Sequence, residues 1–183
     1  IRYNDMDAEW KTVSNLPNLS PNTYLKGFVR VGNYLLTVGT QGALAITPLG
    51  NNGIPAKTEL LSLGDRFPEQ SRTSFNSIAI FDKRVWILGR FQTMVPSEGI
   101  HVNIILLHAH VTAPLDQAAS WSIHMLARGT DSESSDYPTA SVFQANGIAT
   151  DGKGLYVFGG WWNDTGTSAE PDRAVWYWAP PVL

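Results

Sequence analysis

One short phrase recurs along this chain and limits what the chain can fold into. Its copies are Tyr34-Leu-Leu-Thr-Val-Gly39, Arg84-Val-Trp-Ile-Leu-Gly89 and Gly154-Leu-Tyr-Val-Phe-Gly-Gly160. Each copy is an apolar, β-branched or aromatic run that stops at glycine, and a second apolar run with a tight polar turn precedes it. Two such runs joined by a short turn form the pattern of a β-hairpin, so the sequence predicts one hairpin written three times.

The spacing of these hairpins indicates a repeat architecture. Gly39 and Gly89 lie about fifty residues apart, and Gly89 and Gly159 about seventy, which fits one period of a repeat plus an insertion. Further apolar runs predict third strands at 42–48, 102–110 and 174–178, fourth strands at 57–63 and 120–126, and one unmatched fourth strand at 7–14.

The second strands, which reach these glycines, are apolar at consecutive positions rather than at alternate ones. This pattern is typical of strands that are buried on both faces. The chain also has twenty Trp, Tyr and Phe residues in total (seven, six and seven), sixteen Gly, eleven Pro and few helix-favouring stretches. We therefore expect an all-β fold whose sheets pack face to face.

The best copy of the repeat, Asp151-Gly-Lys-Gly-Leu-Tyr-Val-Phe-Gly-Gly160, resembles the kelch-type β-propeller repeat, with Trp10 and Trp121 opening the outer strand of a blade. The other copies depart from the family pattern, because Gly-Gly becomes Gly39-Thr40 and Gly89-Arg90. The resemblance implies one domain, 1–183, made of three four-stranded blades. The blades would span roughly 19–63, 74–126 and 145–178, the last completed by strand 7–14.

Three blades are too few for a ring, since closed propellers have roughly four to eight. Two copies would give six, with strand 7–14 of each copy completing the last blade of the other around a two-fold axis. We therefore expect a strand-exchanged homodimer, in which exposed sheet edges are covered. In the alternative, the chain is a fragment of a longer propeller, or a different second chain completes the ring.

The composition of the chain disfavours several classes of binding partner and of chemistry. The net charge of −3 disfavours nucleic acid and anionic membranes, because both require a basic face. No apolar run is long enough to span a bilayer, and the chain has no cysteine for disulfide or thiol chemistry. No phosphate-binding loop or hydrolase motif occurs, so no cofactor is expected. The chain starts at Ile1 rather than Met, which suggests processing, and we favour secretion without settling the compartment.

The long connections are expected to share one end of the molecule. In a four-stranded meander, the loops between strands two and three lie at the same end as the crossings between sheets. The long segments are of these two kinds, namely 64–75, 90–100, 127–144 and 161–173. Loops on a rigid scaffold usually carry binding residues, so this end is the predicted binding face.

The motif Trp161-Trp162-Asn163-Asp164 lies on that face. Adjacent side chains of a strand point in opposite directions, so one Trp can pack inward while the other meets solvent. An exposed Trp beside Asn, Asp and Arg can bind a sugar, whose apolar face stacks on the ring. Arg90 and Arg173 lie near enough in the repeat frame to contribute, and Glu98 and His101 complete the predicted ligand-binding set. In the other interpretation, both Trp side chains pack inside the blade.

Three histidines could be read as a metal site. His108 and His110 share one face of a predicted strand, and His124 lies on the next strand. Two imidazoles at i and i+2 and one across the ladder could supply three of the ligands that zinc requires. No carboxylate is placed beside them, so we expect hydrogen-bonded or solvent-facing histidines and predict no metal.

The sequence thus favours a binding module, either lectin-like or of the protein-interaction kind, that meets a glycan or another small-molecule ligand on the loop-rich face. A homodimer would present each site twice, which raises avidity for a repetitive surface. The alternative is an enzyme acting on a small molecule at the mouth of the central channel, with scattered candidates in His101, Arg90, Asp164 and Glu98. A scaffolding subunit is the third possibility.

Overall fold

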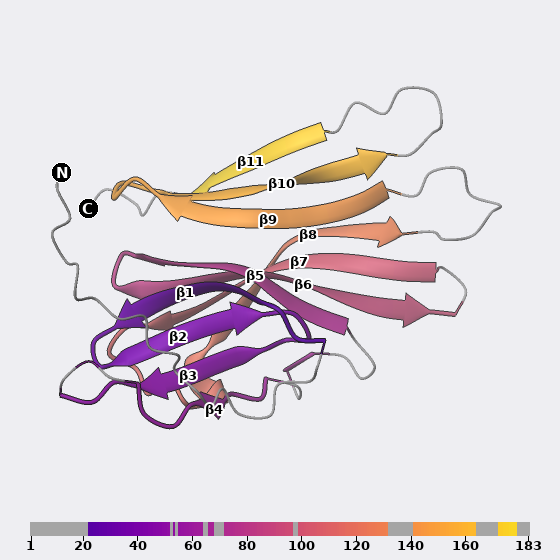
Figure 1. Cartoon of the computed structure of the whole chain (residues 1–183). Coiled ribbons are helices and arrows are strands. Elements are labelled where there is room, and N and C mark those ends of the chain that lie inside the picture. The colour runs from indigo at the N-terminus through magenta and orange to yellow at the C-terminus, as the bar shows by residue number, and fades with distance from the viewer. Residues whose placement is uncertain are drawn as a thin grey trace, which may run out of the picture.

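The chain forms three antiparallel sheets in the part that the computed structural model describes, which is residues 22–51, 53, 55–63, 66–67, 72–96, 99–131, 141–163 and 172–178 (Figure 1). The first sheet has the order β1 (Leu25–Val31), β2 (Tyr34–Gly39), β3 (Leu44–Pro48) and β4 (Glu59–Leu60). The middle sheet has the order β5 (Arg72–Phe81), β6 (Arg84–Val95), β7 (Gly99–His110) and β8 (Ser122–Asp131). The last sheet comprises β9 (Ser141–Thr150), β10 (Leu155–Asn163) and β11 (Asp172–Trp178).

This order confirms the all-β prediction and the succession of three meanders. The predicted third strands end as expected, at Pro48, His110 and Trp178. Of the predicted fourth strand 57–63, only Glu59–Leu60 pairs with β3. The predicted strand 7–14 lies outside the described residues, so its role in closing a blade stays a prediction. A short 3-10 turn, η2 (Ala118–Ser120), precedes β8, and no helix in the described part is long and apolar enough to cross a membrane.

Tight turns close the first hairpin of each sheet. The turn residues with positive φ are Gly32 (55°), Asp82 (46°), Lys83 (56°) and Gly152 (82°). The turns after β1 and β5 have two residues, and positive φ in such turns matches the right-handed twist of the flanking strands. Between β5 and β6 neither turn residue is glycine, and Arg84 donates a 3.1 Å hydrogen bond to the carboxylate of Asp82. This ion pair holds the turn in a conformation that side chains otherwise disfavour.

The middle sheet is buried on both faces, as the continuous apolar pattern of its strands predicted. Along β6, Val85 and Ile87 belong to a core shared with the first sheet. Trp86 and Leu88 point the other way and belong to a core shared with the last sheet. The apolar residues of β7 alternate in the same manner. The middle sheet is therefore the central layer, with the last sheet on one side of it and the first sheet on the other (Figure 1).

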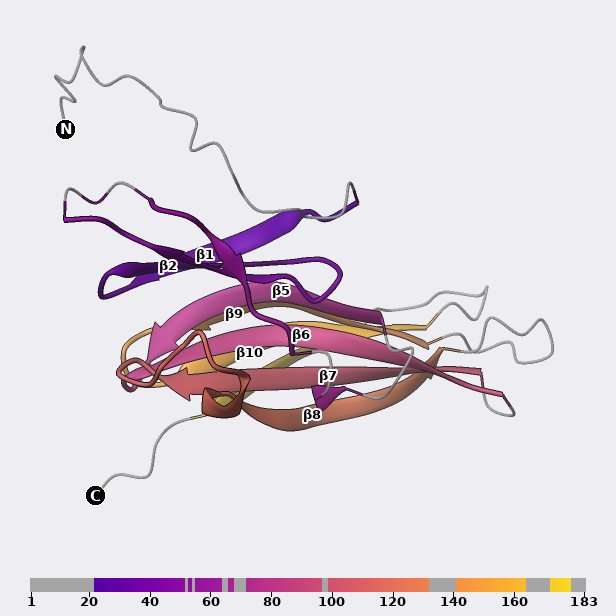
Figure 2. The same ribbon diagram turned by 90° about the horizontal axis from the view of Figure 1, so that it is seen from below.

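The first strands of the three sheets lie side by side. β1 contacts β5, and β5 contacts β9, in agreement with both views of the ribbon (Figures 1 and 2). β9 also crosses the face of the middle sheet and contacts β6, β7 and β8. The sheets are compatible with blade-like repeats, but the described part of this chain does not close into a ring.

Of the long segments assigned to the binding face, 90–100 is largely strand, so its assignment as a loop was wrong. The other three are strand at their ends, and the rest of each lies mostly outside the described residues. β6 and β7 stay paired from Arg84↔His110 as far as Val95↔Gly99, across most of 90–100. β8 continues to Asp131, and β10 continues to Asn163. The sequence interpretation ended the second strands at their glycines, whereas Gly89 and Gly159 lie within continuous ladders. The strands of the middle and last sheets consequently project beyond those of the first sheet (Figure 1).

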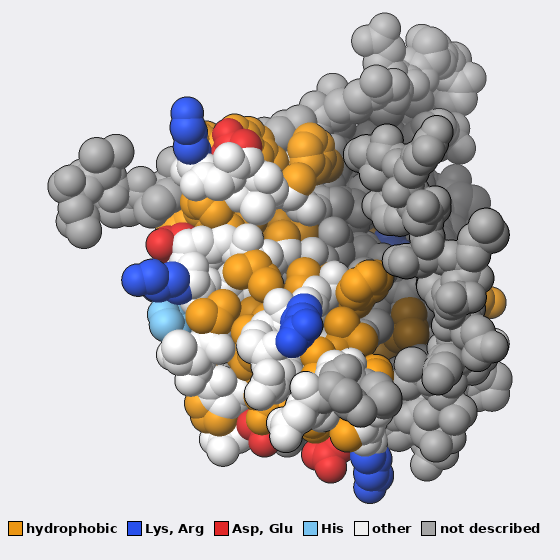
Figure 3. Space-filling view, turned by 60° about the vertical axis from the view of Figure 1, so that its left-hand side comes forward, with side chains coloured by type: hydrophobic (Ala, Val, Ile, Leu, Met, Phe, Trp, Pro, Cys, Tyr) orange, Lys and Arg blue, Asp and Glu red, His pale blue; other side chains and the backbone are white. Residues whose placement is uncertain are grey.

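The two outer sheets leave aromatic side chains exposed on the faces that point away from the middle sheet. Phe28 of β1 is 71% exposed, and its neighbour Val29 packs against the inner core. Phe158 of β10 is 43% exposed and Tyr177 of β11 is 55% exposed, while Val157 packs inward. At the end of the molecule that carries the hairpin turns, apolar side chains are interspersed with single charges of both signs (Figure 3).

Candidate functional site

Each sheet carries a β-bulge at the same place on its first strand. The register of β1 against β2 shifts at Lys26, that of β5 against β6 at Asn76, and that of β9 against β10 at Asn146. A bulge inserts one extra residue into a strand and re-aims its side chain. Three polar side chains therefore leave the three first strands at equivalent positions.

A glycine of the second strand lies beside each bulge, namely Gly39, Gly89 or Gly159. A Cβ atom at Gly39 would collide with the backbone oxygen of Tyr24. A Cβ atom at Gly89 would lie 2.9 Å from the backbone oxygen of Ser74 and 2.7 Å from the ring of Phe75. The glycine that recurs in the sequence is thus the residue that lets the first strand pass close to the second at the bulge.

Hydrogen bonds join the bulges of neighbouring sheets. Lys26 Nζ donates to Asn76 Oδ1 over 2.7 Å, which links the bulge of β1 to that of β5. The backbone N–H of Ile148 donates to Ser77 Oγ over 3.2 Å, close to the bulges of β9 and β5. The bulge of β1 lies near the end where β2 leads into β3, whereas the bulges of β5 and β9 lie in the middle of their strands. Beyond those two bulges, β6 and β10 continue toward the end predicted to bind.

Two cations meet at this junction. Asn76 Oδ1, which accepts the bond from Lys26, also accepts one from Ser74 Oγ over 3.0 Å. Arg90 stands directly across the ladder from Ser74 and is half-buried. Burial, and then the charge of Arg90, lower the pKa of Lys26. Neither Lys26 nor Arg90 forms an ion pair within the described part of the chain; the ion pair found there joins Arg84 and Asp82.

The structure brings Arg90, among the predicted ligand-binding residues, into this junction. Trp161, Trp162 and Asn163 continue β10 beyond Gly159, on the same side of the bulge as Arg90 in β6. Arg173 lies on β11, and Asp164 and Glu98 lie outside the described residues. The proposed roles of these residues in ligand binding stay predictions.

His101, which was also assigned to the ligand, lies inside the structure. It is 3% exposed and stands across from Thr93 on β6. It shares one face of the middle sheet with Asn103, which is 4% exposed. Direct contact between this imidazole and a ligand from solvent would require the surrounding side chains to move.

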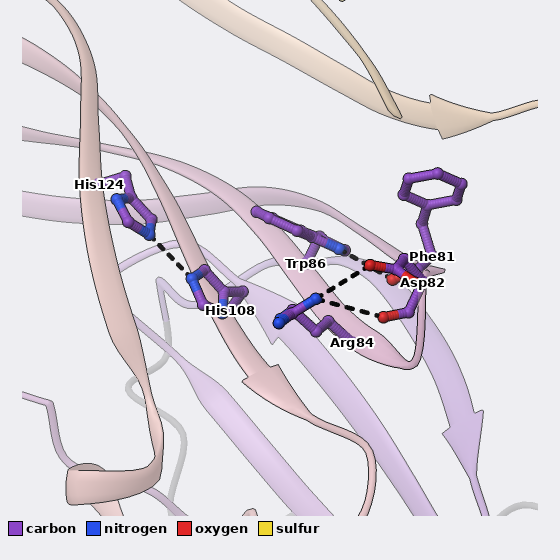
Figure 4. A network of polar contacts seen from close by, with 6 residues as sticks. All are labelled: Phe81, Asp82, Arg84, Trp86, His108 and His124. Atoms are coloured by element: carbon purple, nitrogen blue, oxygen red, sulfur yellow. Dashed lines mark hydrogen bonds and ion pairs between the residues drawn. The ribbon is translucent and has the colours of Figure 1, made fainter. Parts of the chain in front are cut away.

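His108 and His124 are neighbours across the β7–β8 ladder, as predicted (Figure 4). Their Nε2 atoms lie 2.8 Å apart, and their rings stack with centroids 4.9 Å apart. Burial lowers the pKa of His108, and the nearby His124 and Arg84 lower it further. His110 instead makes a 2.7 Å hydrogen bond to the hydroxyl of Thr112. In the described residues no three His, Asp or Glu side chains gather as metal ligands.

The histidine pair lies on the hairpin-turn side of the bulge in the middle sheet, where His108 stands across from Trp86. Trp86 packs on the ring of His108 with centroids 4.7 Å apart and donates through Nε1 to the backbone oxygen of Phe81 over 3.1 Å. These contacts explain the pair as part of the packing between the middle sheet and the aromatic side chains around it.

Sequence reasoning missed the three bulge residues. A signal was available, because Lys26, Asn76 and Asn146 precede Gly39, Gly89 and Gly159 by the same number of residues. Each also stands immediately before the apolar run that opens its hairpin. A polar residue at that repeated position marks the bulge.

No known protein-family model matches this chain, and a comparison with curated proteins finds no significant relative.

Proposed function

We propose that this chain is a half-propeller binding module that pairs with a second copy and recognises a carbohydrate between the bulges and the end of the sheets opposite the hairpin turns. The single observation that carries the binding proposal is the junction of bulges, where inner strands of different sheets present polar side chains side by side. Function in repeat folds usually lies where a rigid scaffold presents such groups together.

The exposed aromatic faces support completion of the ring by a second copy. The middle sheet has both faces covered, whereas the first and last sheets carry exposed aromatic side chains on their outer faces. On the first sheet the exposed part of that face is the edge that carries Phe28, since Thr37 and Ala45 in the same row are buried. In a two-fold dimer, the outer face of the first sheet, with Phe28, would meet the outer face of the last sheet, with Phe158 and Tyr177. The contact would occur twice and would make a ring of six sheets.

The projecting strands support a carbohydrate as the ligand. β10 carries Trp161, Trp162 and Asn163 past the bulge, on the side away from the hairpin turns, while Lys26 and Asn76 meet at the level of the bulges. Aromatic rings and amide groups are the partners that a sugar requires, because its faces are apolar and its edge carries hydroxyls. A dimer would present two such sites and would gain avidity on a repetitive glycan.

A glycan array tests this proposal. The wild-type chain is expected to bind a defined set of glycans, and Asn76→Ala, Trp161→Ala and Trp162→Ala are expected to weaken that signal. Lys153→Gln, in the exposed hairpin turn at the other end of the sheets, is the matched control and should bind like wild type. Absence of any glycan signal from the folded wild-type chain, or a signal that none of the three variants reduces, would contradict the proposal.

A further inference from the structure

The junction of Lys26 and Arg90 favours a ligand group of a particular charge, which the proposed carbohydrate site leaves open. Lys26 is held by an amide oxygen rather than by a carboxylate, since Asn76 Oδ1 is its acceptor. Asn76 is in turn positioned by the hydroxyl of Ser74, which faces Arg90 across the ladder. The arrangement holds Lys26 without neutralising it and places Arg90, from a different sheet, across the ladder from Ser74.

In the described part of the chain, no acidic side chain is paired with Lys26 or Arg90. The chain has sixteen acidic and thirteen basic residues, so anionic side chains are plentiful. In the described residues neither Lys26 nor Arg90 is paired with one of them, and Arg90 makes no hydrogen bond through its guanidinium there. Burial and the charge of Arg90 lower the pKa of Lys26, which shows that the two charges sense each other. Like charges that lie close together favour the binding of an anion.

We propose that Lys26 and Arg90 form a subsite for a carboxylate group of a small ligand. A guanidinium binds a carboxylate through two parallel N–H donors, and an ammonium adds a third donor as a point charge. Ser74 and Asn76 hold the ammonium in place from the neighbouring strand. This inference rests on the proposed binding function of the same end, and it names the charged group that the ligand carries.

The test is a titration of the purified full chain, followed by calorimetry and by amide chemical shifts. The probes are glucuronate, N-acetylglutamate and glucose, which separate a sugar carboxylate, an amino-acid carboxylate and a neutral sugar of the same ring size. The variants are Lys26→Gln and Arg90→Gln, and Lys153→Gln serves as a lysine control distant from the junction. Circular dichroism establishes that each variant is folded before it is titrated.

We expect at least one of the two carboxylates to bind more tightly than glucose, with shifts around Lys26 and Asn76. Loss of one charged hydrogen bond should weaken binding roughly tenfold in each of Lys26→Gln and Arg90→Gln, and Lys153→Gln should leave it unchanged. Binding of glucuronate alone identifies a sugar acid as the source of the carboxylate. Binding of N-acetylglutamate alone keeps the carboxylate subsite and overturns the carbohydrate proposal.

Two results would contradict the carboxylate subsite. If glucose and glucuronate bind equally well and Lys26→Gln changes neither, the carboxylate subsite is wrong while carbohydrate binding stands. If neither carboxylate binds to the wild-type chain at millimolar concentration, the subsite is wrong whatever the variants do. A variant that fails to fold does not affect the second outcome, because that outcome depends on the wild-type chain alone.

Discussion

Substitution by alanine is expected to destabilise the folded chain at the repeated glycines beside the bulges, but not at a glycine elsewhere in a first strand. At Gly89 the added Cβ would lie 2.7 Å from the ring of Phe75 and 2.9 Å from the backbone oxygen of Ser74, closer than real Cβ contacts. Phe75 is fully buried, so neither it nor the backbone can move away without disturbing the core. At Gly39 the added methyl would meet the backbone oxygen of Tyr24.

Overpacking of this kind typically costs about 1–3 kcal/mol. In a chain of this length each kcal/mol lowers the melting temperature by roughly 2–4 °C. Gly147→Ala is the matched control, since a Cβ there would meet nothing within 4 Å and the residue also lies in a first strand. That change should be neutral or should stabilise the chain by about 0.4–1 kcal/mol, because it restricts the unfolded state.

The assay is urea denaturation followed by tryptophan fluorescence, with thermal melting as a second measurement. We expect Gly39→Ala and Gly89→Ala to lower the denaturation midpoint and Gly147→Ala to keep or raise it. Equal stability of Gly89→Ala and wild type would refute the close passage of β5 past β6 at the bulge, and with it the explanation of the repeated glycine.

Three further predictions concern other parts of the fold. Thr47→Val should cost about 1–3 kcal/mol, because the buried hydroxyl of Thr58 loses its 2.7 Å partner, whereas replacing both residues by Val should be nearly neutral in a double-mutant cycle of denaturation measurements. The pKa of His108 is lowered in the folded state, so its stabilising contribution is present above pH about 6.5 and is lost as the pH falls from there through the folded pKa. In His108→Gln the melting temperature should therefore fall less steeply over this pH range, and the same dependence of melting temperature on pH as in wild type would contradict the prediction. The pKa of Asp151 is lowered by backbone N–H groups, so wild type should lose stability relative to Asp151→Asn as the pH falls below the ordinary aspartate pKa of about 3.8. The measurement is acid denaturation of the two proteins in parallel, and an equal loss of stability in both would contradict the hydrogen bonds of this turn.

Much of the fold could be predicted, because hairpins are local. The apolar runs around Gly39, Gly89 and Gly159 gave the strand order of all three sheets, and consecutive apolar residues such as Val85 and Trp86 indicated burial on both faces. Strand pairing between neighbours in the sequence needs only a turn and a matching pattern.

The strand ends and the bulges could not be predicted in the same way. Glycine usually interrupts a strand, so Gly89 suggested a terminus, yet the ladder continues to Val95 because a bulge at Asn76 absorbs the close approach. The meeting of Lys26 with Asn76 joins different sheets, and a periodic pattern within one sheet carries no information about contacts between sheets. The burial of His101 was missed for the same reason.

The exposed aromatic side chains on the outer sheets bear most directly on the proposal that a second copy completes a ring. Phe28 is 71% exposed on one outer face, and Tyr177 is 55% exposed on the other. If a second copy completes the ring, light scattering on the purified chain at micromolar concentration should give twice the 20.1 kDa of one chain. A stable, folded species of 20.1 kDa over the same concentration range would contradict the six-sheet ring.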